Sequence, residues 1–445
     1  MESFNLLPLL TIIVILLSSS LFVYFNFDFL QPTIAFFFVM SVSLLLGTLN
    51  IGRWNLYVGS ETSLIVIGGM LAFAIGAGFL HYNFYKKYTM KTSKIKLGIY
   101  DVPWQIIILC TIVTLSLAYL STKEMYALSV QLGNHDGIMN MIKTVRYPLE
   151  RGEITFSRMN SYRNLIAMVF ATTFLYMFIN NLIVGQNKVI KNLLFLLPVF
   201  SAVPFFILST GRRSMVHFII CGLVLAVIIY QQKYGINHEV RIKILRLLGC
   251  TAFMALFVYF ALGFLTGKVS IGGRDPLTII AHYGGLSVPA LEQYVSSYHP
   301  ENQYIMQNTM MGFYGNLNSL GFHLETGRGF LPFVEFHGTD QITTNVYTIF
   351  YRLMADYSIP GMLVIMFLFG VLLTYVYNYL RHNNSPGILA IYAYFGYIPF
   401  FLFIDDQFMG LFRTRTIYFC LLISGFIYLL RRYYFHYTIR RESNN

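Results

Sequence analysis

The chain has 445 residues, of which 56% are hydrophobic and only 11% are charged, and its mean hydropathy is +0.61. A soluble globular protein carries about 25% charged residues, so this composition excludes an ordinary soluble enzyme. The formal net charge of +12 does not indicate nucleic-acid binding, because many basic residues lie in short connectors between apolar runs.

The apolar residues form long blocks, each close to the roughly 20 residues that a helix needs to cross a bilayer. A membrane β-barrel would need short segments of alternating polarity, which the chain lacks. We therefore expect an all-α fold, a polytopic transmembrane helical bundle of about 11 spans, within a range of roughly 10–12. The expected spans cover 6–25, 30–49, 62–82, 104–120, 163–184, 192–209, 214–230, 247–266, 359–380, 388–404 and 411–430. The four cysteines lie within these spans without a CxxC pair, so neither a disulfide framework nor zinc is indicated.

Three basic connectors, 83–103, 231–246 and 431–445, fall on the same side of the membrane when the spans are counted through. The positive-inside rule makes that side cytoplasmic, so the C-terminus is expected inside and the N-terminus outside. The first apolar run lacks the basic region of a cleavable signal peptide and is therefore counted as a span.

Two long segments then lie outside, a smaller external loop at 121–162 and a large external loop at 267–344. Loops of this length are usually functional. We expect helices in the larger one, because LTIIAHYGGLSVPALEQYV carries apolar residues at helical spacing. Four histidines share this loop without ligand spacing, so no metal site is expected. They are His282, His299, His323 and His337.

Arg212 and Arg213 occupy a tight hairpin between two spans, at the expected external surface. Charged groups at membrane depth are costly and are rarely kept without a partner or a function. A guanidinium also binds phosphate oxygens in a bidentate way that lysine cannot reproduce. Because no acidic residue lies nearby in the sequence, these two arginines favour a functional interpretation over headgroup contact.

Two further groups of arginines lie at span edges and have acidic neighbours. Arg352 precedes a span and lies near Asp356, while Arg413 and Arg415 begin the last span behind the aspartates at 405–406. For the second group, pairing with those aspartates and a functional role remain equally open.

The hairpin ILSTGRRSMVHFIICGLVLA resembles the Thr/Ser-Gly-Arg element of Wzy-type O-antigen and capsule polymerases. The stretch TTNVYTIFYRLMADYSIPGMLVIMFLFG is similar to a second pattern of that family. The pattern begins with Asn-Val-Tyr-Thr, continues with a short amphipathic run, and ends with Asp-aromatic-x-x-x-Gly at the start of a span. Between these elements, IIAHYGGLSVPALEQYV resembles the segment that opens the family's large external loop. The order of the elements and the layout of the spans match over most of 100–430.

This resemblance implies a membrane glycosyltransferase of the GT-C-like type, at the outer face of the bacterial plasma membrane. It would transfer a growing glycan from undecaprenyl diphosphate, the leaving group, to the non-reducing end of a lipid-linked repeat unit. The product would be lipopolysaccharide O-antigen or capsule. The expected partners are the undecaprenyl-diphosphate-linked oligosaccharide, membrane lipids, and the flippase and chain-length regulator of the pathway. No cofactor, metal or nucleic acid is expected.

We expect catalytic roles for Arg213, Arg274 and Asp356. The residues expected to bind substrate are Arg212, Tyr283, Arg328, Tyr347, Arg352 and Arg413. The general base is open among Asp356, Glu325, Asp340 and His282.

If 345–356 is helical, Tyr347 with Tyr351 and Arg352 with Asp356 are i,i+4 pairs. We expect Tyr347, Arg352 and Asp356 to face one cavity together with Arg274, at the level of the Gly211 hairpin. The alternative is an interfacial helix whose tyrosines lie at headgroup level and whose ion pair is a surface contact.

Three other functions remain open. An O-antigen ligase shares the Gly-Arg hairpin but typically has a histidine before the post-loop span, where this chain reads Asn345-Val346-Tyr347. A lipid-linked oligosaccharide flippase or other transporter would have many spans, but shorter loops and charges along a path. The third is a non-catalytic partner in polysaccharide export.

Overall fold

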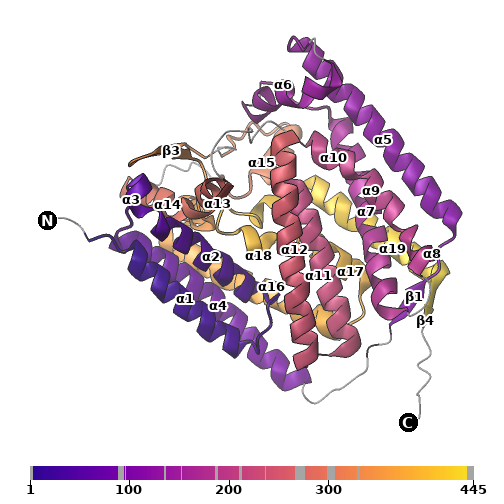
Figure 1. Cartoon of the computed structure of the whole chain (residues 1–445), viewed down its shortest axis with the longest axis horizontal. Coiled ribbons are helices and arrows are strands. Elements are labelled where there is room, and N and C mark those ends of the chain that lie inside the picture. The colour runs from indigo at the N-terminus through magenta and orange to yellow at the C-terminus, as the bar shows by residue number, and fades with distance from the viewer. Residues whose placement is uncertain are drawn as a thin grey trace. The chain divides into compact units, whose positions relative to one another are not determined.

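The computed structural model describes residues 4–88, 95, 97–134, 137–151, 153–185, 189–209, 213–235, 237–265, 276–297, 306–327 and 331–437. In these ranges, 10 helices are long and apolar enough to cross a membrane, which confirms an all-α polytopic bundle (Figure 1). The chain divides into two compact units. Unit 1 comprises Met1–Ser93, Arg274–Tyr379 and Tyr397–Ile417, and unit 2 comprises Lys94–Gly273, Leu380–Gly396 and Tyr418–Asn445.

The long helices of unit 1 pack through small residues. They are α1 (Leu7–Tyr24), α2 (Pro32–Leu49), α4 (Ser60–Tyr88) and α16 (Ile349–His382). In Figure 1, α1, α2 and α4 lie side by side. A Cβ atom on Gly76 of α4 would collide with the carbonyl of Phe367, and one on Gly370 of α16 with the carbonyl of Phe73. The two backbones therefore approach more closely than larger residues would allow, as is typical of membrane helices.

The first two helices of the large loop, α13 (Pro276–Gly285) and α14 (Ser287–Ser296), lie where the sequence predicts them and pack on α2. A Cβ atom on Gly47 would lie 2.7 Å from the carbonyl oxygen of Gly285. The hydroxyl of Ser43 donates to the Gly284 carbonyl at 2.5 Å. These contacts hold the start of the loop against a membrane helix.

A β-hairpin in the same loop was not expected. β2 (Val334–His337) and β3 (Gln341–Thr344) are antiparallel, with Val334 opposite Thr344. Buried and exposed residues alternate along both strands, and in β2, VEFH, the sequence itself alternates between apolar and polar residues. The turn lies on α3 (Ile51–Trp54), where the Arg53 carbonyl accepts hydrogen bonds from the Asp340 amide and the Thr339 hydroxyl, both at 3.1 Å.

α16 joins the short amphipathic helix and the span that the sequence predicts separately. The junction is Ser358, whose φ of 58° and ψ of 179° interrupt the helix. This backbone conformation is essentially restricted to glycine and stores strain in a serine. Unit 1 ends with α18 (Ile398–Phe401), the short 3₁₀ helix η1 (Met409–Leu411) and the first residues of α19 (Thr414–Tyr434).

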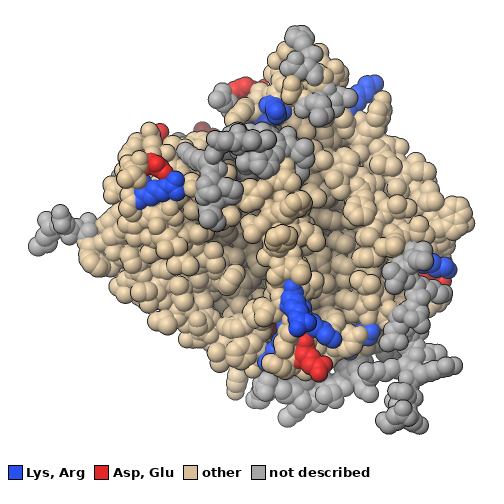
Figure 2. Space-filling view, in the orientation of Figure 1, with Lys and Arg blue, Asp and Glu red and all other residues tan. Residues whose placement is uncertain are grey.

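Unit 2 is built around α7 (Arg158–Val184), which packs against α5, α9, α11 and α17. Its other helices are α5 (Trp104–Gln131), α6 (Ile138–Arg151), α8 (Val189–Leu193), α9 (Leu196–Ser201), α10 (Val203–Leu208), α11 (Arg213–Tyr234), α12 (His238–Leu265), α17 (Pro386–Tyr394) and most of α19. Figure 2 shows Lys and Arg beside Asp or Glu at the end where α11 and α12 join. That end includes the connector 231–246, for which a cytoplasmic position remains a prediction of the positive-inside rule.

The helices of this region differ in detail from the expected layout. The segment 121–162 is largely helical, because α5 meets no glycine or proline before Gly133, where φ reaches 84°. The expected span at 192–209 is confirmed as a stretch of membrane-spanning length, Lys191–Leu208, and that at 388–404 matches the shorter apolar stretch Pro386–Phe401, although each is built from short helices. α10 and α18 both have proline in their first turn, where a missing N–H costs no helical hydrogen bond.

A small sheet in unit 2 is closed on one edge by side chains. β1 (Gly98–Tyr100) pairs antiparallel with β4 (Phe435–Tyr437). On the other edge of β1, the Asn181 amide accepts from the Tyr100 N–H at 2.8 Å and donates to the Tyr100 carbonyl at 2.7 Å. The Asn180 amide donates to the Gly98 carbonyl at 2.8 Å. Two asparagines of α7 thus occupy the main-chain groups that a third strand would use.

Candidate functional site

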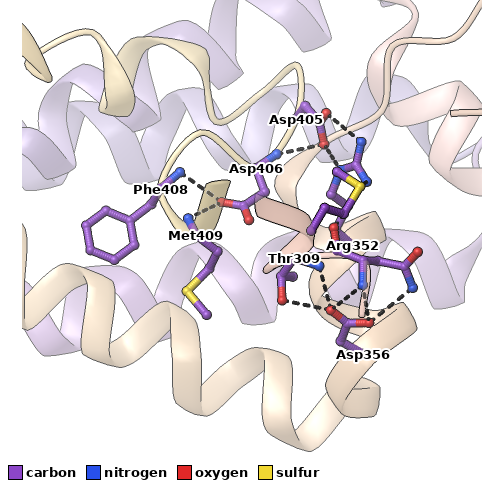
Figure 3. Close-up of polar contacts among 9 residues, drawn as sticks. Thr309, Arg352, Asp356, Asp405, Asp406, Phe408 and Met409 are labelled. Carbon is purple, nitrogen blue, oxygen red and sulfur yellow. Dashed lines mark hydrogen bonds and ion pairs between the residues drawn. The ribbon is translucent and has the colours of Figure 1, made fainter. Parts of the chain in front are cut away.

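Charged side chains of unit 1 gather at the start of α16 (Figure 3). We call this group the polar cluster. Its members are Asn308, Thr309, Arg352, Asp356, Asp405 and Asp406. They come from the loop before α15 (Met311–Ser319), from α16 and from the segment between α18 and η1.

Arg352 is buried, with 4% of its surface exposed. Its Nε donates to Asp405 Oδ1 at 2.7 Å and its Nη2 to Asp405 Oδ2 at 3.1 Å, a bidentate ion pair. Its Nη1 donates to the Asn308 carbonyl at 3.3 Å. The guanidinium is therefore bound within the protein on all three nitrogens.

Asp356 holds the loop segment that precedes α15. Its carboxylate accepts hydrogen bonds from the main-chain N–H groups of Asn308 and Thr309, at 3.0 and 2.7 Å. The Thr309 hydroxyl and the Asn308 side-chain amide also donate to it, at 2.7 and 3.1 Å. Four donors on one carboxylate make Asp356 a positioning group for the loop in this structure.

Asp406 differs from its neighbours because one of its oxygens is unpaired. Oδ1 accepts from the main-chain N–H groups of Phe408 and Met409, at 2.9 and 3.0 Å. Oδ2 is buried and has no hydrogen-bond partner among the described residues. Burial raises the pKa of this carboxyl from 3.8 to about 7; Asp405 adds to the rise, while the two N–H groups and Arg352 oppose it. Asp406 is therefore protonated in a substantial fraction of molecules at neutral pH.

Three tyrosines pack beside the cluster. The expected i,i+4 pair is confirmed, since the rings of Tyr347 and Tyr351 lie 4.7 Å apart. The ring centroid of Tyr351 in turn lies 4.2 Å from that of Tyr294 in α14. Tyr347 is only 2% exposed and its hydroxyl donates to the Pro332 carbonyl at 3.1 Å. Burial raises the pKa of the Tyr347 hydroxyl, and the neighbouring Tyr351 raises it further. Its ring is core packing here and is not open to a sugar.

One expected pairing is corrected by the structure. The ion pair of Arg352 is made to Asp405 and not to Asp356, whose carboxylate receives the 308–309 segment. Pairing of Arg413 with Asp405, one of the two alternatives left open, is not the arrangement found here. Arg413 is exposed, and its Nε donates to the Gly410 carbonyl at 2.8 Å.

Three of the expected site residues are exposed to solvent or lipid. They are Arg213, the first residue of α11 in unit 2, and Tyr283 and Arg413 in unit 1. Arg212, Arg274 and Arg328 lie outside the described residues, as does Gly211. The cavity expected from these groups thus rests partly on segments that the structure does not describe.

The remaining candidates for a general base differ in their surroundings. Asp340 forms an ion pair with Arg53. The Nε2 of His282 lies 2.8 Å from the Thr343 carbonyl, while Glu325 is exposed. Among the described residues, no group of three or more His, Cys, Asp or Glu side chains is arranged to hold a metal ion.

The sequence analysis missed the roles of Asp405 and Asp406. Two adjacent acids after an apolar run were visible, but the partner of Asp405 lies 53 residues away. Comparison of the chain with family models, curated proteins and solved structures finds no match.

Proposed function

We propose that this protein is a membrane glycosyltransferase that polymerises lipid-linked oligosaccharide repeat units. A hydroxyl at the non-reducing end of the acceptor unit attacks the anomeric carbon of the donor glycan. The bond from that carbon to the diphosphate breaks, undecaprenyl diphosphate leaves and the hydroxyl proton is released. The reaction runs at the outer face of the plasma membrane, and the C-terminus is cytoplasmic.

The observation that carries the proposal is an exposed arginine at the start of an apolar helix. Arg213 begins α11, one of the helices long and apolar enough to cross a membrane. Its guanidinium lacks an ion-pair partner among the described residues, in contrast to that of Arg352. The start of a helix carries partial positive charge, which makes an extra arginine unfavourable there unless an anion is bound.

The geometry also revises the roles expected from the sequence. Arg213 is proposed to bind the donor diphosphate and to stabilise the charge that develops on it. Arg352 and Asp356 are proposed as positioning residues that hold the large loop. Arg212, Arg274 and Arg328 remain proposed ligands of the substrate, and no metal is proposed, since the arginines supply positive charge.

The test uses the full chain in nanodiscs with a synthetic undecaprenyl-diphosphate-linked repeat unit. The expected product is a ladder of glycans that increase by one repeat unit, formed equally in excess chelator. Arg213→Lys keeps charge but loses bidentate geometry, so it should slow the ladder by roughly tenfold or more. Arg53→Lys is the matched control, because Arg53 is exposed but already paired with Asp340.

Other outcomes separate the alternatives. Transfer of single glycans to a lipid A–core acceptor, without a ladder, would identify a ligase. Movement of the lipid-linked unit between leaflets without a new glycosidic bond would identify a transporter. Loss of the ladder in chelator, with rescue by a divalent ion, would contradict metal independence.

A further inference from the structure

The helix α15 in the large loop leaves an apolar face uncovered. None of its residues, Met311–Ser319, is buried. Phe313, Leu317 and Leu320 follow one another at i, i+4 and i+7, so they share one face of the helix and the turn that ends it. Phe313 is 47% exposed and Leu320 76%. An apolar surface of this kind usually marks an interaction site.

α15 is fixed next to the start of a membrane helix. It packs on η1, and a Cβ atom on Gly312 would lie 3.0 Å from Cβ of Arg413. Thr414, the next residue, begins α19, one of the helices apolar enough to cross a membrane. The segment before α15 is bound by Asp356, two residues before the break at Ser358. Contacts at both places hold α15 at the level where membrane helices begin.

The composition of α15 limits what can cover it. Residues 311–322, MGFYGNLNSLGF, contain no charged side chain and three aromatic rings. Beside them, Phe412 is 46% exposed, and Arg413 is exposed with its terminal nitrogens unpaired among the described residues. An uncharged aromatic surface next to an exposed arginine is complementary to acyl chains below a layer of phosphates.

We propose that α15 is an interfacial helix that rests on the phospholipid bilayer. The face formed by Phe313, Leu317 and Leu320 lies at the boundary between headgroups and acyl chains. Arg413 binds a phospholipid phosphate beside it. The large loop is therefore anchored to the membrane surface independently of its contacts with the bundle. This inference depends on the exposed side chains and the composition of α15, and it does not require the glycosyltransferase activity.

The experiment measures the depth of spin labels in nanodiscs of phosphatidylcholine and phosphatidylglycerol. Single labels are placed by Phe313→Cys and Leu317→Cys, with Ser319→Cys as the matched control on another face of the helix. The background replaces the native cysteines, Cys110, Cys221, Cys250 and Cys420, with alanine. The ratio of oxygen to nickel-chelate accessibility should be at least threefold higher at 313 and 317 than at 319.

A second variant tests the phosphate contact. Arg413→Gln should lower the accessibility ratio at 317 by about half, whereas Arg53→Gln should leave it unchanged. Addition of undecaprenyl phosphate should have no effect, because the partner is bulk phospholipid. A change that appears only with the polyprenyl lipid would overturn the proposal in favour of substrate binding.

The remaining results would also overturn it. Equal ratios at all three positions would place the face of α15 in water. If neither oxygen nor the nickel chelate reaches the labels at 313 and 317, protein covers this face of α15. Spin–spin broadening that disappears on dilution with unlabelled chain would identify that protein as a second copy.

Discussion

Two arginine–aspartate ion pairs of unit 1 use the same chemistry in opposite surroundings. In the pair Arg352–Asp405 the side chains are 4% and 23% exposed, and in Arg53–Asp340 they are 41% and 49% exposed. Each arginine also binds the large loop, Arg352 through the Asn308 carbonyl and Arg53 through the Thr278 hydroxyl. A solvated pair contributes about 0–1 kcal/mol, whereas a buried charge that loses its partner costs roughly 3–5 kcal/mol. Burial therefore decides which of the two pairs the fold depends on.

The largest effect is expected from Arg352→Ala. This change leaves the half-buried Asp405 without its cation and should lower the free energy of unfolding by roughly 3–5 kcal/mol. Thermal unfolding in nanodiscs measures it. The double variant Arg352→Met, Asp405→Leu removes both charges and should recover most of the loss. If the double variant is as unstable as the single one, the cost does not come from the unpaired charge.

Asp356→Ala should have the next largest effect. It removes the acceptor of four hydrogen bonds and leaves the N–H groups of Asn308 and Thr309 unpaired, at a cost of roughly 2–3 kcal/mol. Proteolysis within 306–327 should also accelerate, because the loop loses this contact. Glu325→Ala, an exposed acid of the same loop, is the matched control and should behave as wild type. Equal cleavage of both variants would show that Asp356 does not hold the loop.

Asp406 should make stability depend on pH in the direction opposite to a paired carboxylate. Its pKa rises from 3.8 to about 7 on folding, so between these values the folded state keeps a proton that the unfolded state loses. The free energy of unfolding should therefore fall as pH rises through this window, by roughly 1–2 kcal/mol between pH 5 and 7.

The variant Asp406→Asn isolates this effect, because asparagine cannot titrate but still accepts the N–H groups of Phe408 and Met409. The difference in stability between variant and wild type, followed by thermal unfolding, should grow in favour of asparagine from pH 5 to 7. A difference that stays constant over this range would exclude a raised pKa at Asp406.

The smallest effect is expected at the exposed pair. A double-mutant cycle of Arg53→Ala and Asp340→Ala should give a coupling energy below about 1 kcal/mol. The coupling should shrink further in about 1 M salt, which screens exposed charges. A coupling as large as that of Arg352 with Asp405 would remove the distinction between the two pairs.

Most of the fold follows from local sequence, because crossing a bilayer demands a long apolar run. All eleven expected spans coincide with apolar helices, ten of them long and one the shorter pair within Pro386–Phe401. The loop helices α13 and α14 were also predictable from helical spacing. The strand β2 of the hairpin, VEFH, carries an alternation of apolar and polar residues that is readable in the sequence.

The candidate site was less predictable, because its pairings are decided by distant segments. The i,i+4 rule correctly predicted the contact of Tyr347 with Tyr351, which depends only on helix geometry. The same rule failed for Arg352 and Asp356. The main-chain N–H groups at 308–309 bind Asp356, and Asp405 binds Arg352, and neither arrangement is encoded within the helix.

The asparagines that line β1 have a consequence for association between molecules. An edge strand with unpaired main-chain groups can recruit a strand from another chain, which is a common route to aggregation. Here the Asn180 and Asn181 amides already bind the outward groups of Gly98 and Tyr100. The outer edge of β1 is therefore a poor template for a strand of a neighbouring protein, because α7 occupies three of its main-chain groups.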